Sequence, residues 1–248
     1  MMLRMLDLFS GIGGFSYAGE KLVGGYETVA FCEYDKHAQK VLRKHWPDTE
    51  IIDDVRELAN DADRFRGMVD IITGGYPCQP FSYAGVRRGD QDDRHLWPAM
   101  LTVIEKVRPN WVIGENVAGH ITLGLDTVLS DLEAAGYASR CFVIPAVAAD
   151  ARHRRDRCWI VANTDSAHPQ RGRFSSGIQP QHPKSDGRSD KGRWQAPQFW
   201  EPEPAICRVV NGVPGRIHRL KQLGNSIVPQ VAARILYAIR EAHEQTTV

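Results

Sequence analysis

Short apolar runs alternate with helix-forming stretches through the first 162 residues, and this alternation limits the fold more than any other feature. The predicted strands are Arg4–Phe9, Glu27–Glu33, a short third strand ending before Asp54, Asp70–Thr73, Trp111–Gly114, Tyr137–Ile144 and Cys158–Ala162. The predicted helices lie near Phe15–Leu22, from Asp35 to about Lys44, and at Leu96–Lys106, Leu125–Ala135 and Gln230–His243. Strands and helices at this spacing predict an α/β protein with a doubly wound, mostly parallel sheet.

Composition agrees with one large folded domain. Of the 248 residues, 42% are hydrophobic and 25% are charged, as in ordinary globular proteins with a sizeable core. No apolar run reaches the roughly 18 residues that a membrane span requires, and the N-terminus does not resemble a secretory signal. The five cysteines are odd in number and form no C-x-x-C pair, which argues against a disulfide framework or a zinc cage. We therefore expect a cytoplasmic protein without a membrane association.

Charge is distributed unevenly along the chain. Residues 1–150 contain 15 Lys and Arg against 22 Asp and Glu, whereas residues 151–248 contain 16 against 8. The basic half includes a stretch, residues 163–200, that is rich in Gly, Pro, Ser, Gln and His and has few aliphatic side chains. Such a stretch is typical of a disordered linker or of a segment that contacts nucleic acid.

This change in composition also suggests how the chain is organised. We expect a catalytic domain over residues 1–162 and a short, basic, irregular segment over residues 163–210. Residues 211–248 then form a C-terminal segment with a helix that returns to the first domain.

A glycine-rich loop, DLFSGIGG at residues 7–14, follows the first predicted strand. Glycines allow the backbone to approach a ligand at a helix N-terminus, although this spacing differs from the G-x-G-x-x-G dinucleotide motif. Glu33 ends the second strand and suits the two hydroxyls of a ribose, and Asp54 can accept from an adenine amino group. Each carboxylate can also be an ordinary solvated surface acid. The loop and the two acids together indicate a nucleotide-like ligand.

A distinctive cysteine follows the fourth strand, within GGYPCQPFS at residues 74–82. Cys78 stands at the carboxyl end of a parallel strand, where α/β proteins bind ligands. By contrast, Cys32, Cys141 and Cys158 lie in or beside apolar runs and are expected to be inert core residues. Cys78 therefore differs from these three cysteines, because it lies in a loop at a candidate ligand site.

Three charged side chains are predicted to lie near the same edge of the sheet. The fifth strand ends in Glu115-Asn116-Val117, which brings a carboxylate there. The segment HRRDR at residues 153–157 leads into a strand, whose alternation predicts Arg155 and Arg157 on one side, facing a phosphate or a base carbonyl. The polar loop at residues 87–94 is flexible enough to close over a substrate.

Five motifs in this order resemble the C5-cytosine DNA methyltransferases, of the compact type found in phages and prophages. They are DLFSGIGG, GGYPCQPFS, ENV, HRRDR and QLGNSIVP, spread over residues 7–229. The resemblance covers nearly the whole chain except residues 163–200, where the family has its variable target-recognition segment. The chain departs from the family in having His153 in place of the usual Gln and in the shortness of that segment.

The resemblance implies a Rossmann-like methyltransferase that uses S-adenosylmethionine and methylates C5 of a flipped-out cytosine through a covalent Cys78 adduct. Glu115 would act at N3 of the base, Arg157 would hold its O2, and Arg155 would brace the pocket or a backbone phosphate. Contacts with the methyl donor are implied for Phe9, Gly11, Gly13, Glu33, Tyr34, Asp54, Val55, Pro77, Leu96, Asn225 and Ser226. DNA contacts are expected at Ser82, Arg87, Arg88, Arg171, Arg173, Arg188 and Arg193.

The resemblance also implies double-stranded DNA as the partner and a reaction without a metal. We expect a monomer, with a cognate restriction endonuclease as a candidate partner. Three alternatives stay open: an RNA cytosine-5 methyltransferase of the same fold, a catalytically inactive DNA-binding relative, and a dinucleotide-dependent oxidoreductase. The last would explain the sheet but leaves Pro77-Cys78 and the arginine run unexplained. Methyl transfer to duplex DNA or to RNA separates the first alternative from the DNA enzyme.

Overall fold

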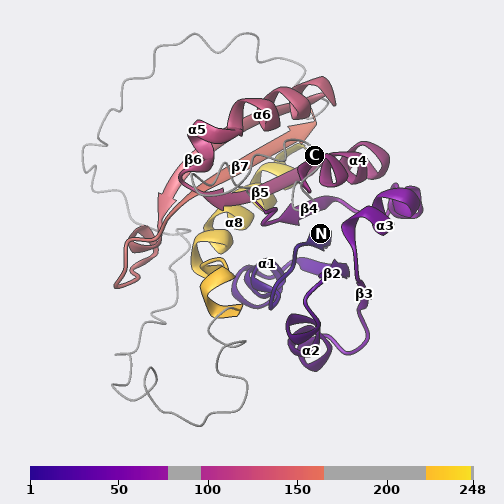
Figure 1. Ribbon diagram of the computed structural model, residues 1–248, viewed down its shortest axis with the longest axis horizontal. Helices are drawn as coiled ribbons and strands as arrows, with labels where there is room; N and C mark the ends of the chain where they lie inside the picture. The colour runs from indigo at the N-terminus through magenta and orange to yellow at the C-terminus, as the bar shows by residue number, and fades with distance from the viewer. Residues whose placement is uncertain (78–95, 165–221, 247–248) are drawn as a thin grey trace, which may run out of the picture.

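The computed structural model of the protein describes residues 1–77, 96–164 and 222–246 (Figure 1). These residues form a seven-stranded sheet with the order β3-β2-β1-β4-β5-β7-β6. The strands are β1 (Leu3–Leu8), β2 (Tyr26–Cys32), β3 (Glu50–Ile52), β4 (Ile71–Gly74), β5 (Trp111–Val117), β6 (Tyr137–Pro145) and β7 (Asp156–Thr164). Strands β1 to β5 pair in parallel, whereas β7 runs antiparallel to both β5 and β6. The predicted doubly wound, mostly parallel sheet is confirmed.

Helices cover both faces of this sheet (Figure 1). They are α1 (Gly14–Tyr17), the π-helix η1 (Ala18–Val23), α2 (Lys36–His45), α3 (Val55–Asp61), the 3-10 helix η2 (Ala62–Phe65), α4 (Trp97–Val107), α5 (His120–Leu123), α6 (Leu125–Ala134), the 3-10 helix η4 (Ala146–Ala149) and α8 (Pro229–Thr246). Buried residues of α3, α4 and α6 belong to one hydrophobic cluster, and those of α1 and α8 belong to another. Within the described ranges, no helix has both the length and the apolar character needed to cross a bilayer.

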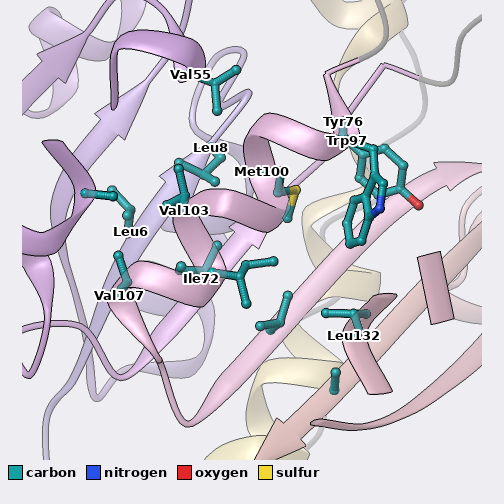
Figure 2. Packing of buried hydrophobic residues seen from close by; sticks show 14 of the residues in the cluster. Leu6, Leu8, Val55, Ile72, Tyr76, Trp97, Met100, Val103, Val107 and Leu132 are labelled. Atoms are coloured by element: carbon teal, nitrogen blue, oxygen red, sulfur yellow. The ribbon is translucent and has the colours of Figure 1, made fainter. Parts of the chain in front are cut away.

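The larger hydrophobic cluster lies between the sheet and helices α3, α4 and α6. Leu6 and Leu8 of β1 and Ile72 of β4 pack there against Met100 and Val103 of α4 (Figure 2). Leu6 and Leu8 are two residues apart in β1, and Ile72 lies in the neighbouring strand β4. The alternation of side chains along a strand therefore places all three on one face of the sheet. This packing fixes the carboxyl ends of β1 and β4, from which the site is built.

Two sequence predictions are corrected by the fold. The predicted single helix at residues 15–22 is instead the short α1 followed by η1, in which the amide of Gly24 donates to the carbonyl of Gly19. Over so few residues, an apolar pattern does not distinguish an α-helix from the wider π-helix. Strand β7 also runs from Asp156 to Thr164, beyond both ends of the predicted strand Cys158–Ala162.

The prediction for α2 is confirmed by its cap. The Asp35 side chain accepts from the amides of His37 and Ala38, which satisfies two donors at the start of the helix. Among the cysteines expected to be inert, Cys32 and Cys158 are buried, whereas Cys141 is half-buried. Burial raises the pKa of the Cys32 thiol, which suppresses the reactive thiolate.

Candidate active site

A pocket that is partly open to solvent lies at the carboxyl ends of β1, β4 and β5. Between β1 and β4 the order of the strands reverses, and such switch points are where open α/β sheets bind their ligands. The pocket is lined by Phe9, Ser10, Gly11, Ile12, Gly14, Phe15, Gly75, Glu115, Asn225, Ser226 and Ile227. It therefore joins the glycine-rich loop, the end of β5 and the loop before α8.

The glycines of the loop after β1 serve two different purposes. Gly11 and Gly13 both have positive φ angles, of 55° and 83°. A Cβ atom on Gly11 would meet no heavy atom within 4 Å, so the backbone there faces open space. A Cβ atom on Gly13 would come within 2.7 Å of the Trp46 ring. Gly11 thus leaves room for a ligand, whereas Gly13 allows close packing of the loop against the end of α2.

Glu33 connects this loop to the turn after β2. One of its carboxylate oxygens accepts from the amide of Gly11 and the other from the amide of Asp35, both at 2.7 Å. The neighbouring Tyr34 is 75% exposed. A carboxylate held beside the glycine loop, next to an exposed aromatic ring, fits a nucleoside with a ribose and a stacked base.

Asp54 and Val55 begin α3 at the same edge of the sheet. The Asp54 side chain caps α3 by accepting from the Arg56 amide at 2.9 Å, and it pairs with the Arg56 guanidinium at 2.8 Å. This hydrogen-bonded arginine lowers the pKa of Asp54. Val55 is buried. Neither Asp54 nor Val55 lines the pocket, and their contact with a methyl donor stays a prediction.

Glu115 and Arg157 form a buried ion pair at the other end of the pocket. Antiparallel pairing of β5 with β7 brings Arg157 opposite Val117, two residues from Glu115. Arg157 Nε lies 3.0 Å from Glu115 Oε1, and only 8% of Glu115 is exposed. Burial raises the pKa of Glu115, although Arg157 and Arg155 oppose this shift. The site thus contains a carboxyl group that holds its proton more tightly than usual.

Arg155 directly precedes β7 and has a positive φ of 39°. Arg155 Nη2 donates to the carbonyls of Gly224 and Ser226, at 2.8 and 2.7 Å. Like Arg157, it acts on Glu115 and opposes the rise in the pKa of that carboxyl. The two hydrogen bonds attach the loop before α8 to the start of β7, and the contact of both arginines with a phosphate or a base carbonyl stays a prediction.

Five of the predicted site residues line the pocket together: Phe9, Gly11, Glu115, Asn225 and Ser226. Pro77 is exposed where the first described range ends, and Leu96 is half-buried at the start of α4. The remaining predicted residues lie outside the described ranges: Cys78, Ser82, Arg87, Arg88, Arg171, Arg173, Arg188 and Arg193.

Six residues of the pocket wall are not among the predicted site residues: Ser10, Ile12, Gly14, Phe15, Gly75 and Ile227. A Cβ atom on Gly75 would lie 3.4 Å from Glu115 Oε2, so the backbone after β4 passes directly beside the carboxylate. The Gly74-Gly75 pair was a signal that could have identified this approach. Ile227 packs so closely on Gly14 that a Cβ there would lie 2.6 Å from Ile227 Cγ1. No local signal predicts that contact, because the two residues lie near opposite ends of the chain.

Comparisons with known proteins agree with this arrangement. A sequence model of the family described as C-5 cytosine-specific DNA methylase matches residues 3–196. The chain is 33% identical over 167 residues to the type II methyltransferase M.Eco47II of Escherichia coli, covering 64% of this chain and 39% of that protein. It is 32% identical over 173 residues to the type II methyltransferase M.CviJI of Paramecium bursaria Chlorella virus IL3A, covering 68% and 46%. The chain therefore spans less than half the length of these curated relatives.

The fold resembles a crystal structure of a DNMT2 mutant from Spodoptera frugiperda, with a TM-score of 0.60 and 21% sequence identity. This likeness covers 73% of the present chain and 56% of the insect protein. At this identity the similarity concerns the fold.

Proposed function

The chain belongs to the C-5 cytosine-specific DNA methylase family, and from this membership we propose that it transfers a methyl group from S-adenosylmethionine to C5 of cytosine in double-stranded DNA. One observation carries the proposal. The glycine loop and the buried Glu115 line the same pocket, so a donor bound at the loop and a base held at Glu115 would be in contact there. Methyl transfer requires such contact, because the reacting atoms must be about 3–3.5 Å apart.

The residues at the glycine-loop end fit S-adenosylmethionine. Open space beside the Gly11 backbone leaves room for the donor, and Glu33 is held next to it for the ribose hydroxyls. Exposed Tyr34 can cover the adenine, and Asn225 and Ser226 close the opposite wall. When bound, S-adenosylmethionine supplies an electrophilic methyl group on its sulfonium.

The residues at the other end fit activation of the cytosine, whose C5 is a poor nucleophile. We assign the covalent step to Cys78, whose thiolate forms a bond to C6 and pushes an electron pair through the ring toward N3. Glu115 supplies a proton to N3 at that moment, and its raised pKa favours the protonated form that this role requires. Once C5 carries the methyl group, a base removes the C5 proton, the C5–C6 double bond forms again and expels the Cys78 sulfur with its bonding electrons, and the N3 proton returns to Glu115.

The two arginines complete this end of the site. Arg157 holds O2 of the base and orients Glu115, with which it is paired. Arg155 braces the pocket through its hydrogen bonds to the Gly224 and Ser226 carbonyls. A backbone phosphate is the other ligand that its guanidinium suits.

Double-stranded DNA is the partner that we propose, and its cytosine must leave the base stack because C6 is shielded there. The excess of Lys and Arg in residues 151–248 supports a polyanionic partner. We propose residues 163–200 as the target-recognition segment. A cognate restriction endonuclease and a monomeric state are further proposals from the same family membership.

The decisive experiment measures transfer of labelled methyl groups from S-adenosylmethionine to duplex DNA and to RNA, followed by bisulfite sequencing of the DNA. We expect methylation of cytosine in duplex DNA only. Cys78→Ser should abolish the transfer while leaving S-adenosylmethionine binding within a few-fold, because a hydroxyl is a far weaker nucleophile than a thiolate. Transfer to RNA alone would assign the protein to RNA, and turnover by Cys78→Ser would refute the nucleophile.

A further inference from the structure

The backbone leaving β4 runs beside the end of β5 at Gly75 and is hydrogen-bonded to it at Tyr76. Gly75 passes beside the Glu115 carboxylate on the pocket side. The carbonyl of Tyr76 accepts from the Asn116 side-chain amide at 3.0 Å. Because successive residues of an extended chain point to opposite sides, the Tyr76 ring lies on the other face, in the larger hydrophobic cluster. The segment that leads to Cys78 therefore starts from a fixed place beside Glu115.

The ring of Tyr76 is also held, by two neighbouring rings and by a hydrogen bond. Its centroid lies 5.1 Å from the Trp97 ring, beside which it is seen in Figure 2, and 5.4 Å from the His120 ring. A Cβ atom on Gly114 would approach the Tyr76 ring to 3.2 Å, so the glycine at this position of β5 leaves room for the ring. Tyr76 Oη and His120 Nε2 share a hydrogen bond of 2.8 Å.

This hydrogen bond is buried, since Tyr76 is 3% and His120 is 5% exposed. A buried hydroxyl or imidazole that loses its partner has a substantial desolvation cost, so the bond fixes the depth and direction of the Tyr76 ring. His120 begins α5, which directly follows the chain segment that carries Glu115 and Asn116. Asn116 of β5 thus holds the backbone of Tyr76, and His120 of α5 holds its ring.

We propose that Tyr76 and His120 are positioning residues for methyl transfer, because their hydrogen bond sets where the chain leaves β4 toward Cys78 relative to Glu115. The proposal rests on the proposed function and adds to it two residues that contact neither the base nor the methyl donor. Pro77 and Cys78 follow Tyr76 directly in the sequence, so a shift of Tyr76 is passed to the nucleophile. A misplacement of about 1 Å between reacting groups can reduce a rate on the order of 100-fold.

Tyr137→Phe provides a matched control for Tyr76→Phe. Tyr137 is also 3% exposed, and its hydroxyl donates to the Pro109 carbonyl at 2.9 Å, at the amino end of β6 and away from the pocket. Both variants remove one buried tyrosine hydrogen bond and should lower the melting temperature by similar amounts. Only Tyr76→Phe should reduce kcat for methyl transfer, by about tenfold, with the Kd for S-adenosylmethionine unchanged within twofold.

His120 supplies a second and independent variant. His120→Phe should lower kcat as Tyr76→Phe does, and the double variant should be no slower than either, because both remove the same bond. His120→Gln places an amide near the position of Nε2 and should restore most of the rate. Equal kcat values for Tyr76→Phe, Tyr137→Phe and the wild type would overturn the proposal, as would failure of His120→Gln to differ from His120→Phe.

Hydrogen exchange gives a readout that does not depend on activity. The amides of Gly75 and Tyr76 should exchange at least several-fold faster in Tyr76→Phe and in His120→Phe, and at the wild-type rate in Tyr137→Phe. Unchanged exchange in the first two variants would refute the positioning role even if the wild type transferred no methyl groups. Absence of transfer by the wild type, with the expected exchange pattern, would instead refute the proposed function alone.

Discussion

The two ends of the pocket are built from different chemistry. At the glycine-loop end, the buried carboxyl of Asp7 accepts from the hydroxyls of Ser16 and Thr73. At the β5 end, the buried carboxyl Glu115 is paired with Arg157 and lies near Arg155. Burial raises the pKa of both acids, that of Asp7 to about 7. Their neighbours differ, because hydroxyls serve either protonation state whereas arginines favour the ionised one.

This difference suggests a division of labour. Neutral hydroxyl partners suit a carboxyl that supports the loop, since no charge has to change during the reaction. Burial favours the protonated form of the carboxyl, whereas two cations favour the ionised form. These opposing influences suit a group that gives a proton and takes it back. The comparison predicts that changes at the β5 end affect the chemical step, whereas changes at the loop end affect stability or binding of the methyl donor.

The largest expected effect is that of Glu115→Gln. An amide cannot supply the proton at N3, so methyl transfer should fall about 1,000-fold, with the affinity for S-adenosylmethionine within about threefold of the wild type. In the wild type, kcat should decrease as the pH rises through the raised pKa of Glu115, because the protonated form is lost. Single-turnover rates across pH measure both effects. Glu50→Gln, at an exposed pair with Arg64, is the control. A rate for Glu115→Gln near that of this control would refute the assigned role.

Asp7→Asn should have the next largest effect, which is an effect on the stability of the folded protein. The folded-state pKa of about 7 lies above the ordinary value of 3.8, so the folded protein binds the proton more tightly than the unfolded chain. The associated stability is fully present below about pH 4 and is lost as the pH rises through 7. At about 1.4 kcal/mol per pKa unit, and allowing for relaxation, we expect the wild type to lose about 2–3 kcal/mol of its free energy of unfolding over this pH range.

Urea unfolding at pH 5 and pH 8 tests this expectation. The wild type should lose stability between the two values, and Asp7→Asn should lose less, because its amide does not titrate. Identical pH dependence in the two proteins would show that Asp7 is not the responsible group. Methyl transfer at pH 7 should change less in this variant than in Glu115→Gln.

Gly11→Ala should have the smallest effect, on binding of the methyl donor. The new methyl group enters the open space beside the loop, and the positive φ of 55° costs about 1 kcal/mol in any L-residue. We expect affinity for S-adenosylmethionine to fall about tenfold by calorimetry, with kcat at saturation within threefold. Gly67→Ala, at a φ of 72° with nothing within 4 Å, carries a similar backbone cost away from the pocket. Equal affinities in the two variants would exclude Gly11 from the donor site.

Local signals identified most of the individual elements. Asp35 was recognised as a helix cap because its side chain satisfies amides only two and three residues away. Phe9, Gly11, Glu115, Asn225 and Ser226 were each identified by motif, and the pocket brings these five together. The prediction that Arg155 and Arg157 lie on one side depends on strand alternation, although Arg155 precedes the strand and has a positive φ; both arginines act on Glu115.

The sequence by itself determined the alternation of strands and helices and the family, and it named the candidate site residues. Each of these depends on apolar periodicity or on motifs of a few consecutive residues. Only the tertiary structure decided that β7 runs antiparallel between β5 and β6, which pairs Arg157 with Glu115. It alone also joined Arg155 to Ser226 and Tyr76 to His120. These contacts link residues far apart in the chain, and they form only when packing of the whole sheet and its helices brings the segments together.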